Sequence, residues 1–395
     1  MNVGLLTGEY PPDQGGVGDF TNRLALSLVA LEHQVHVITS ASTTRDQGTQ
    51  DSGLVTLPDG LFVHRVIGGW RVGCWRIILE LARDLNLDIL NLQYQAAAYS
   101  MRPAINFVPR RRRFPVVVTF HDLKVPYLFP KAGPLRWWVV RALARRADGV
   151  IVTNREDELR LAGVEPPIAS LTRIPIGSNI SSVAPPGYDR DAERASWGIG
   201  RDDVLLGYFG FLNESKGGEE LIRSLSLLVE QGVPAHLLKI GGRVGSSDPT
   251  NQAYADGVER LVTSLGLEDR VHWTGYLQPT RVSASLYATD ICVLPYRDGV
   301  SFRRGSLLAC LAHGKAIVTT RPAVALPEVK HDQTMVLVDP ENPAALAQAA
   351  KRITADPALR ARLERGSKWL ASEFTWDRIG TRTGAFFAKL TRGDQ

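Results

Sequence analysis

The sequence is poor in cysteine, which excludes two classes of stabilised fold. Its 395 residues include Cys74, Cys292 and Cys310, an odd number spaced far apart. No C-x-x-C pair occurs, so neither a disulfide framework nor a zinc knot is indicated. We therefore expect a reduced, cytoplasmic setting.

Long apolar runs are also lacking. No segment approaches the ~20 uninterrupted apolar residues that cross a bilayer as a helix. The chain enters a strand-like run at once, Val3 to Leu6, so no signal peptide is predicted. The histidines lack the spacing of metal ligands, and no D-x-D pair indicates a nucleotide-bound Mg²⁺. We expect no metal cofactor.

The composition describes a globular chain with two domains. Hydrophobic residues make up 44% and charged residues 22%, and 395 residues exceed one ordinary core. The net charge of +5 suits a polyanionic ligand such as a nucleotide diphosphate, or an anionic membrane surface. Much of the excess lies in Arg110 to Arg113 and in Arg141, Arg145 and Arg146.

Short apolar runs alternate with helical patterns in both halves of the chain. This alternation predicts α/β domains with parallel sheets. A stretch rich in Gly, Ser and Pro, 177–189, separates the halves as a linker. The predicted strands are 2–7, 34–39, 89–92, 116–119 and 150–153, then 204–209, 236–240, 271–274, 291–294, 316–319 and 336–338. The predicted helices include 19–31, 218–231 and 251–265.

Ligands of open parallel sheets bind beyond the carboxyl ends of the strands, so residues just after strands are the candidates. After the first strand, Gly15, Gly16 and Gly18 would let backbone amides approach an anion, at a helix that begins near Asp19. An ordinary tight turn between strand and helix carries equal weight.

Two later segments offer cations. Lys216 follows the strand 204–209 and precedes two glycines that open a helix. Arg303 and Arg304 stand before another helix, for which Ser306 is the predicted N-cap and Gly314 the end. A guanidinium pair beside free helix amides predicts a diphosphate site. The alternative is a capped helix flanked by solvent-exposed arginines.

His121 and Asp122 follow the strand 116–119. The imidazole could hydrogen-bond sugar hydroxyls or orient an acceptor. Asp122 could instead cap the segment that follows it.

Taken in chain order, these segments resemble the retaining glycosyltransferases of family 4. The motifs are E-Y-P-P-D-Q-G-G-V-G, V-V-V-T-F-H-D, A-D-G-V-I-V-T-N, I-P-I-G-S-N, G-Y-F-G-F-L-N-E-S-K-G-G, D-R-V-H-W-T-G-Y, A-T-D-I-C-V-L-P-Y and A-H-G-K-A-I-V-T-T. The resemblance covers nearly the whole chain and implies the GT-B fold, in which two Rossmann-like domains face each other across a cleft.

The resemblance also implies a division of labour. An N-terminal acceptor domain, 1–180, would be joined by a C-terminal helix, 375–395, and a donor domain would span 190–374. The donor is a nucleotide sugar, with a UDP-sugar favoured, and no nucleic acid is expected. The acceptor is a sugar-bearing or small molecule, and its candidate contacts are Glu9, Tyr10 and Asp122.

The chain departs from the family at the donor site. Phe211 stands where the family usually has an arginine, while Lys216 is retained. The two usual glutamates, separated by seven residues, align with Ser301 and Ala309. A subset carries D-G-V-S-x-R-R-G-S instead, which indicates a rearranged donor site.

In that rearranged site, Asp298 is the nearest carboxylate, Arg303 replaces the missing guanidinium, and Arg304, Gly305 and Ser306 complete the phosphate contacts. The predicted catalytic residues are His121, Lys216 and Arg303, which hold the reacting groups and stabilise the departing diphosphate. A non-catalytic nucleotide-sugar-binding protein or partner subunit remains an alternative because both glutamates are missing. A nucleotide-sugar epimerase of the same fold is a third.

The segment 134–146 predicts a helix with Trp137, Trp138, Val139 and Leu143 beside arginines. Such a helix suits peripheral contact with anionic lipid at the inner face of the membrane. The favoured alternative is an ordinary surface helix that packs its apolar stripe on the sheet.

Overall fold

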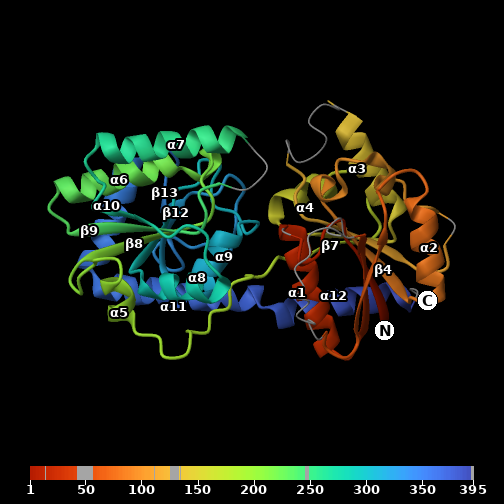
Figure 1. Cartoon of the computed structure of the whole chain (residues 1–395). Coiled ribbons are helices and arrows are strands. Elements are labelled where there is room, and N and C mark those ends of the chain that lie inside the picture. Colours follow the sequence, from red (N-terminus) through yellow and green to blue (C-terminus); the bar gives the residue numbers. More distant parts are fainter. Residues whose placement is uncertain are drawn as a thin grey trace. The chain divides into compact units, whose positions relative to one another are not determined.

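The computed structural model describes residues 1–13, 15–41, 57–110, 112–124, 133, 135–244 and 249–392. The chain divides into two compact units (Figure 1). Unit 1 comprises Met1–Gly177 and Thr375–Gln395, and unit 2 comprises Ser178–Phe374.

Unit 1 is built on a parallel sheet of seven strands in the order β3-β2-β1-β4-β5-β6-β7. The strands are β1 (Asn2–Leu6), β2 (Gln34–Ser40), β3 (Leu61–Ile67), β4 (Ile89–Tyr94), β5 (Val116–Phe120), β6 (Gly149–Val152) and β7 (Leu171–Arg173). The helices are α1 (Gly16–Ala30), α2 (Cys74–Asp84), α3 (Leu135–Arg146), α4 (Arg155–Ala162) and α12 (Trp376–Thr391). The central strands are buried on both faces, which explains their unbroken apolar character.

The sequence predicted five of these strands and missed two. β3 lies at the sheet edge, where exposed and buried residues mix, and β7 has three residues, none of them fully buried. Neither has the continuous apolar run of a central strand. The first helix begins at Gly16, three residues before the predicted start at Asp19.

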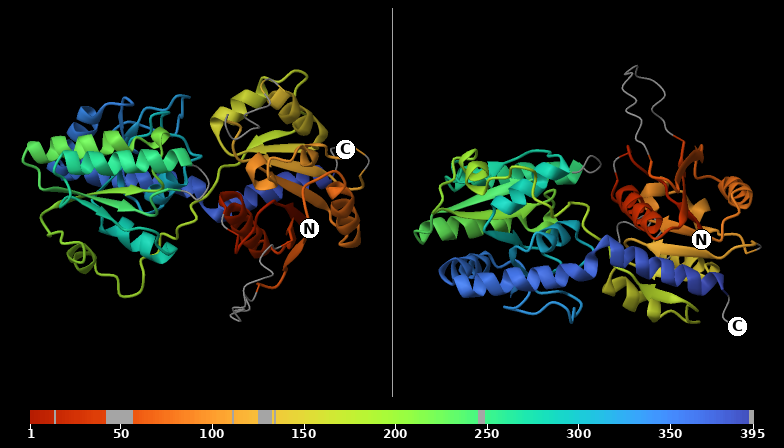
Figure 2. Two further views of the ribbon diagram at one scale, coloured as in Figure 1. Left: turned by 45° about the horizontal axis from the view of Figure 1, so that its top comes forward. Right: turned by 90° about the horizontal axis from the view of Figure 1, so that it is seen from below.

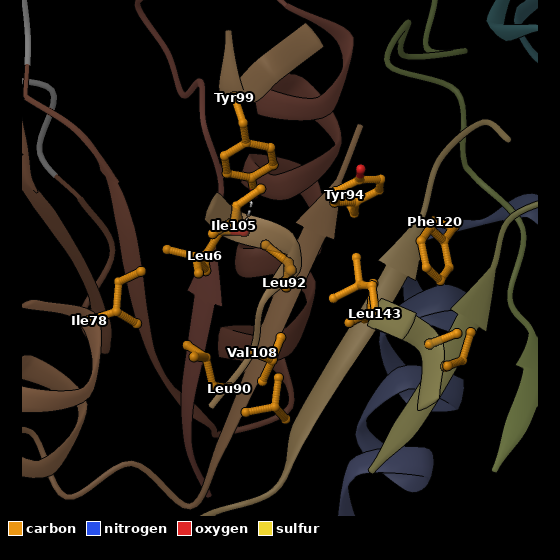
Figure 3. Close-up of a cluster of buried hydrophobic side chains, with 14 of the residues drawn as sticks. Leu6, Ile78, Leu90, Leu92, Tyr94, Tyr99, Ile105, Val108, Phe120 and Leu143 are labelled. Carbon is orange, nitrogen blue, oxygen red and sulfur yellow. Dashed lines mark hydrogen bonds between the residues drawn. The ribbon is translucent and has the colours of Figure 1, made fainter. Parts of the chain in front are cut away.

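One face of this sheet carries a core made from several elements (Figure 3). Leu6, Leu92 and Phe120 come from three neighbouring strands, while Ile78 comes from α2 and Leu143 from α3. On the other face α12 packs beside α1, as both views in Figure 2 show.

A glycine allows this close approach of α12 to α1. A Cβ on Gly380 would come within 2.1 Å of Ser27 Oγ, and that hydroxyl donates to the carbonyl of Trp376 at 2.7 Å. The end of the chain therefore belongs to the core of unit 1.

Unit 2 repeats the arrangement with six parallel strands in the order β10-β9-β8-β11-β12-β13. The strands are β8 (Val204–Phe209), β9 (Ala235–Ile240), β10 (Val271–Trp273), β11 (Ile291–Leu294), β12 (Ala316–Thr320) and β13 (Val336–Val338). The helices are α5 (Arg190–Ala195), α6 (Gly218–Glu230), α7 (Pro249–Ser264), α8 (Pro279–Ala288), α9 (Gly305–Ala312), α10 (Pro343–Ala355) and α11 (Pro357–Ala371). α6 and α7 lie on one side of β8 and β9, and α8 lies on the other (Figure 1). Both units are therefore Rossmann-like, as predicted.

Candidate functional site

The strand order of unit 2 brings two loops together at the edge of the sheet that is formed by the carboxyl ends of its strands. β8 and β11 are neighbours although β9 and β10 lie between them in sequence, so the order reverses at this point. Ligands of open parallel sheets bind at the carboxyl ends of the strands where the order reverses. The loop after β8 contains Gly210 and the 3-10 turn η4 (Glu214–Lys216), and the loop after β11 leads to α9. The predicted cationic segments therefore lie at the same edge.

Two glycines let these loops approach each other. Gly210 has φ +122, and a Cβ on it would lie 3.6 Å from Lys216 Nζ and 3.7 Å from Ser306 Cβ. Gly217 has φ +69, and its Cβ would lie 2.0 Å from the carbonyl oxygen of Pro295. Both backbone conformations favour glycine. Lys216 and Ser306 consequently flank one bare stretch of backbone.

Lys216 presents its ammonium at this edge. Among the residues described, its Nζ has no hydrogen-bond or ion-pair partner; it lies 5.9 Å from the centre of the Phe211 ring. Burial, and after it the positive charge of Arg304, lowers the pKa of Lys216 from 10.5 to about 8. Since a bound anion favours the charged form of a lysine, this side chain is well placed for a phosphate.

The two arginines before α9 occupy different places. Arg304 Nη2 donates to Asp298 Oδ1 at 2.5 Å, and its guanidinium lies 4.8 Å from the centre of the Tyr296 ring. Arg303 Nη2 lies 3.9 Å from Asp298 Oδ2. Arg304 is the arginine whose charge acts on Lys216.

Two sequence-based interpretations of the segment before α9 were wrong. Ser306 is not the N-cap of α9, because the helix begins at Gly305 with Arg304 at the cap position. The Ser306 hydroxyl instead shares a 2.8 Å hydrogen bond with the Tyr296 hydroxyl. The arginines are also not solvent-exposed: 8% of the Arg303 side chain and 14% of the Arg304 side chain are accessible. Because both side chains are largely buried at the start of the helix, the alternative of a capped helix flanked by solvent-exposed arginines is excluded.

The backbone at the start of α9 is open beside Gly305. The first amides of an α-helix have no partner within the helix and carry partial positive charge. A Cβ on Gly305 would meet no atom within 4 Å. Ser301 and Ala309 stand where the family usually has glutamates; Ala309 is fully buried, and its carbonyl faces His313 Nδ1 at 2.7 Å.

Sequence reasoning missed Arg297, which joins the two loops. Its backbone amide donates to Ser215 O at 3.0 Å, and its guanidinium binds Glu220 at 2.8 Å, Glu214 at 3.1 Å and Glu219 at 3.2 Å. These glutamates flank Lys216 in sequence. Their density around a predicted ligand lysine was the available signal, since such a cluster needs a counter-charge.

In unit 1 the glycine-rich loop already holds an anion of the chain itself. The Glu9 carboxylate accepts hydrogen bonds from Val17 N at 3.0 Å and Gly18 N at 3.3 Å, at the start of α1. Burial raises the pKa of Glu9, while these two amides oppose the rise. A ligand phosphate at Gly15 and Gly16 would share this helix start with Glu9, and that role stays a prediction.

His121 ends a chain of buried polar side chains. Its Nε2 lies 2.9 Å from Gln93 Oε1, and Gln93 Nε2 donates to Asn91 Oδ1. Since that Gln93 oxygen can only accept, Nε2 carries the proton and Nδ1 is an acceptor. Burial lowers the pKa of His121 to about 3, so the imidazole is neutral at working pH. Gln93 and Asn91 were missed, although two polar residues in an apolar strand were a visible signal.

Tyr10 and Asp122 have local partners. Tyr10 is buried in the core and its hydroxyl donates to Asn22 Oδ1 at 2.8 Å. Asp122 Oδ1 accepts from Lys124 N at 2.8 Å, which matches the capping role considered for it. A role for Glu9, Tyr10 or Asp122 in acceptor binding stays a prediction.

The apolar stripe of α3 packs on the sheet. Val140 and Leu143 are buried in the core of unit 1, and Trp137 packs against it. Leu135 and Trp138 remain 66% and 59% exposed. Pro134 and Arg111, which belonged to the predicted membrane-binding segments, lie outside the described residues. No helix in the described ranges has the length and apolar character to cross a membrane.

Metal ligands do not gather at this edge. Across the described parts of the chain, no group of three or more His, Cys, Asp or Glu side chains is arranged to hold a metal ion.

Comparison with known proteins bears on both units. The "Glycosyl transferase 4-like domain" matches residues 15–177, and "Glycosyl transferases group 1" matches residues 203–356. D-inositol 3-phosphate glycosyltransferase of Streptomyces bingchenggensis is 23% identical over 96% of this chain and 86% of its own length. Glycogen synthase of Mycobacterium tuberculosis is 24% identical over 100% of this chain and 96% of its own.

Solved structures share the fold. Anabaena HepE in complex with UDP matches with a TM-score of 0.74 and 19% identity, over 98% of this chain and 100% of that one. Sucrose-phosphate synthase of Thermosynechococcus elongatus matches with a TM-score of 0.71 and 21% identity, over the whole of both chains. With a glycosyltransferase domain in each Rossmann-like unit, the chain is a glycosyltransferase of the GT-B fold.

Proposed function

We propose that this glycosyltransferase, whose donor is a nucleotide sugar, takes a UDP-sugar and binds its diphosphate at the edge of unit 2 between the loops after β8 and β11. The observation that carries the proposal is the Lys216 ammonium, which has no hydrogen-bond or ion-pair partner among the described residues and lies near Ser306 and the positive charge of Arg304. An ammonium in this setting gains most when an anion binds.

The groups around Lys216 suit a departing diphosphate. Lys216 and Arg304 supply two positive charges, and the amides of Gly305 and Ser306 supply donors at a helix start. Preorganised donors of this kind are worth several kcal/mol at a developing charge. We assign Arg304 the role that the sequence favoured for Arg303, because Arg304 is electrostatically coupled to Lys216. Asp298, which also lies near Arg303, would then hold Arg304 in place.

His121 of unit 1 is proposed to bind a sugar hydroxyl. Its protonated Nε2 is engaged by Gln93, so Nδ1 can accept a hydrogen bond from a hydroxyl group. A neutral imidazole brings no charge of its own to that contact. We keep the Gly15–Gly16 loop as a candidate donor contact, and Glu9, Tyr10 and Asp122 as candidate acceptor contacts.

The preference for UDP rests on similarity. Anabaena HepE has the same fold and was solved with UDP, and also with UDP-glucose. The acceptor is proposed to be a sugar-bearing or small molecule, since matched relatives include the D-inositol 3-phosphate glycosyltransferase and a 2-deoxystreptamine glucosyltransferase of Streptomyces kanamyceticus. Transfer with retention follows from the resemblance to family 4, in which the acceptor hydroxyl attacks from the face that the diphosphate leaves.

The test is release of nucleoside diphosphate from UDP-, GDP-, ADP- and dTDP-sugars with a panel of acceptors. Release with the UDP-sugar, and a product whose anomeric configuration matches the donor by NMR, supports the proposal. Release from another donor instead contradicts the choice of base. Tight binding with no release in any combination would favour the non-catalytic protein that the missing glutamates at Ser301 and Ala309 first raised.

A further inference from the structure

A second lysine is buried next to the proposed donor site. Lys239 lies on β9 and is 1% exposed. In the sheet Lys239 is the register partner of Tyr208 on β8 and of Trp273 on β10. Its Nζ donates to the carbonyl oxygen of Gly241 at 2.9 Å and to that of Gly242. A lysine in the apolar run A-H-L-L-K-I is therefore tied to the turn at the carboxyl end of its strand.

That turn borders the site of Lys216. A Cβ on Gly241 would lie 4.0 Å from Gly210 N, and a Cβ on Gly242 would lie 3.2 Å from the Phe211 ring. Gly210 and Phe211 are the residues that Lys216 Nζ approaches. Lys239 thus holds the turn that packs against Gly210 and Phe211.

The charges around Lys239 are mostly positive. Lys216 from η4 and Arg243 after β9 both act on its amine, and Arg304 acts on Lys216 in turn. Asp256 and Glu259 of α7 are engaged by Arg243. Tyr208 on β8 is neutral, because burial raises its pKa well above the usual range. His236, three positions before Lys239, points to the opposite face and bonds His272 of β10.

Within the described ranges, no ion pair joins a carboxylate to Lys216 or Lys239. A buried ammonium without a counter-ion is unfavourable, and two that repel each other are more so. Burial, and after it the charges of Lys216 and Arg243, lowers the pKa of Lys239 to about 7. An anion bound at Lys216 would supply the missing negative charge for both amines.

We propose that Lys239 is a positioning residue of the donor site, which holds the Gly241–Gly242 turn and forms with Lys216 a pair that takes up protons when a nucleoside diphosphate binds. The inference rests on the proposed function, since it needs the diphosphate at Lys216. The bound diphosphate would act as the counter-ion that no carboxylate of the described residues supplies to these two lysines.

The direction in which UDP affinity changes with pH follows from the protonation of the two lysines in the free protein. At pH 8 the free pair is only partly protonated, because the pKa values are about 8 for Lys216 and about 7 for Lys239. Binding raises both pKa values, so protons enter from solvent in the range above pH 7. A phosphate group with its second pKa near 6 is already fully ionised at pH 8 and contributes no proton. Affinity should therefore fall as the pH rises above 8.

The experiment is isothermal titration calorimetry of the full chain with UDP at pH 8. Two buffers of different ionisation enthalpy, neither of them phosphate, report the protons taken up. At pH 8 the free protein leaves room for about 0.5 proton on Lys216 and about 0.9 on Lys239, so we expect about one proton per UDP in the wild type and at most about 1.4, and about 0.5 in Lys239→Met. Between pH 7.5 and 8.5 the Kd of the wild type should rise by about tenfold per pH unit for each proton taken up.

Two further variants separate this role from structure alone. Lys239→Arg keeps a fixed positive charge, so it should bind UDP at pH 8.5 at least as well as the wild type and take up about 0.5 proton at pH 8. Lys315→Met is the matched control: Lys315 is also buried and donates to a backbone carbonyl, that of Thr289, but it precedes its strand β12. It should leave the proton count unchanged.

Equal binding enthalpies in both buffers for the wild type overturn the inference, and so does a proton count that Lys239→Met and Lys239→Arg leave unchanged. If Lys239→Met does not fold, the wild type, Lys239→Arg and Lys315→Met still decide. Absence of binding with UDP, GDP, ADP and dTDP overturns the proposed donor site and the inference together.

Discussion

Replacing Lys216 should separate stability from activity, because the ligand, rather than the fold, uses its charge. Lys216→Met removes an ammonium that has neither a hydrogen bond nor an ion pair among the described residues. The unbranched methionine keeps an apolar contact for the Phe211 ring. We therefore expect a protein that is at least as stable as the wild type and nearly inactive.

The size of the stability effect follows from the pKa. Burial and Arg304 lower the pKa of Lys216 from 10.5 to about 8, and each unit corresponds to about 1.4 kcal/mol. Since the side chain is partly exposed, we allow for solvent screening and expect a gain of about 1 to 2 kcal/mol at pH 7. Below pH 8 the cost of the ammonium is fully present. Between pH 8 and 10.5 the folded wild type loses the proton first, so its stability rises relative to Lys216→Met and the gap closes.

The activity should change in the opposite direction. Loss of one donor to a developing charge lowers turnover by about 100- to 1,000-fold, or about 2.7 to 4 kcal/mol. Urea unfolding at pH 7 and pH 9.5 measures the stability, and single-turnover release of nucleoside diphosphate measures the rate. Lys351→Met is the control, because Lys351 is an exposed lysine of the same unit that contacts Gln231.

Two results would refute this reasoning. A Lys216→Met protein that is less stable than the wild type by more than about 1 kcal/mol at pH 7 would mean that the ammonium stabilises the fold. Turnover within about threefold of the wild type would place the diphosphate elsewhere.

Three further predictions concern other parts of the chain. Arg304→Met should lower single-turnover release by about 100-fold, and its double mutant with Lys216→Met should lose less than the product of the two; a larger loss in Arg303→Met than in Arg304→Met would restore the role first predicted for Arg303. Co-sedimentation with anionic vesicles at low salt tests the membrane interpretation of α3: peripheral contact predicts binding that Trp138→Ser reduces, because Trp138 is exposed, whereas the favoured surface-helix alternative predicts equal binding of the wild type to neutral and anionic vesicles. Gly380→Ala should lower the free energy of unfolding by about 1 to 3 kcal/mol, measured in urea with Gly163→Ala as the control, because its Cβ would overlap Ser27 Oγ; an unchanged midpoint would mean that α12 shifts freely.

Most of the fold could be predicted because central strands of a parallel sheet are buried on both faces and read as unbroken apolar runs. β8 was predicted at its observed bounds, and β2, β5 and β12 were placed to within one residue. β3 and β7 were missed because an edge strand with mixed exposure lacks this signature. The sequence predicted two Rossmann-like domains, and the structure has two parallel sheets of this kind. The roles of the two units in acceptor and donor binding remain predictions.

The placement of the candidate residues at strand ends could be predicted from the sequence, whereas their contacts could not. Strand ends located Lys216 and the segment before α9, since the carboxyl ends of parallel strands carry ligands. The pattern could not tell Arg303 from Arg304, because neighbouring residues before a helix differ only in what surrounds them. Ser306 was misassigned as an N-cap because its partner, Tyr296, lies ten residues earlier and meets it only through the turn after β11.

Sequence alone was enough to predict the alternation of strands and helices, the break after the first half of the chain, and the loops that carry lysine, arginine and glycine. These are local properties of hydrophobic period and backbone preference. Only the folded chain shows that Glu9 occupies the start of α1, that His121 is kept neutral by burial beside Gln93, and that the charge of Lys216 acts on Lys239. Such contacts depend on where loops and strand ends come to lie once the sheets have formed. Their charges depend on burial and on neighbouring charges, which no stretch of sequence contains.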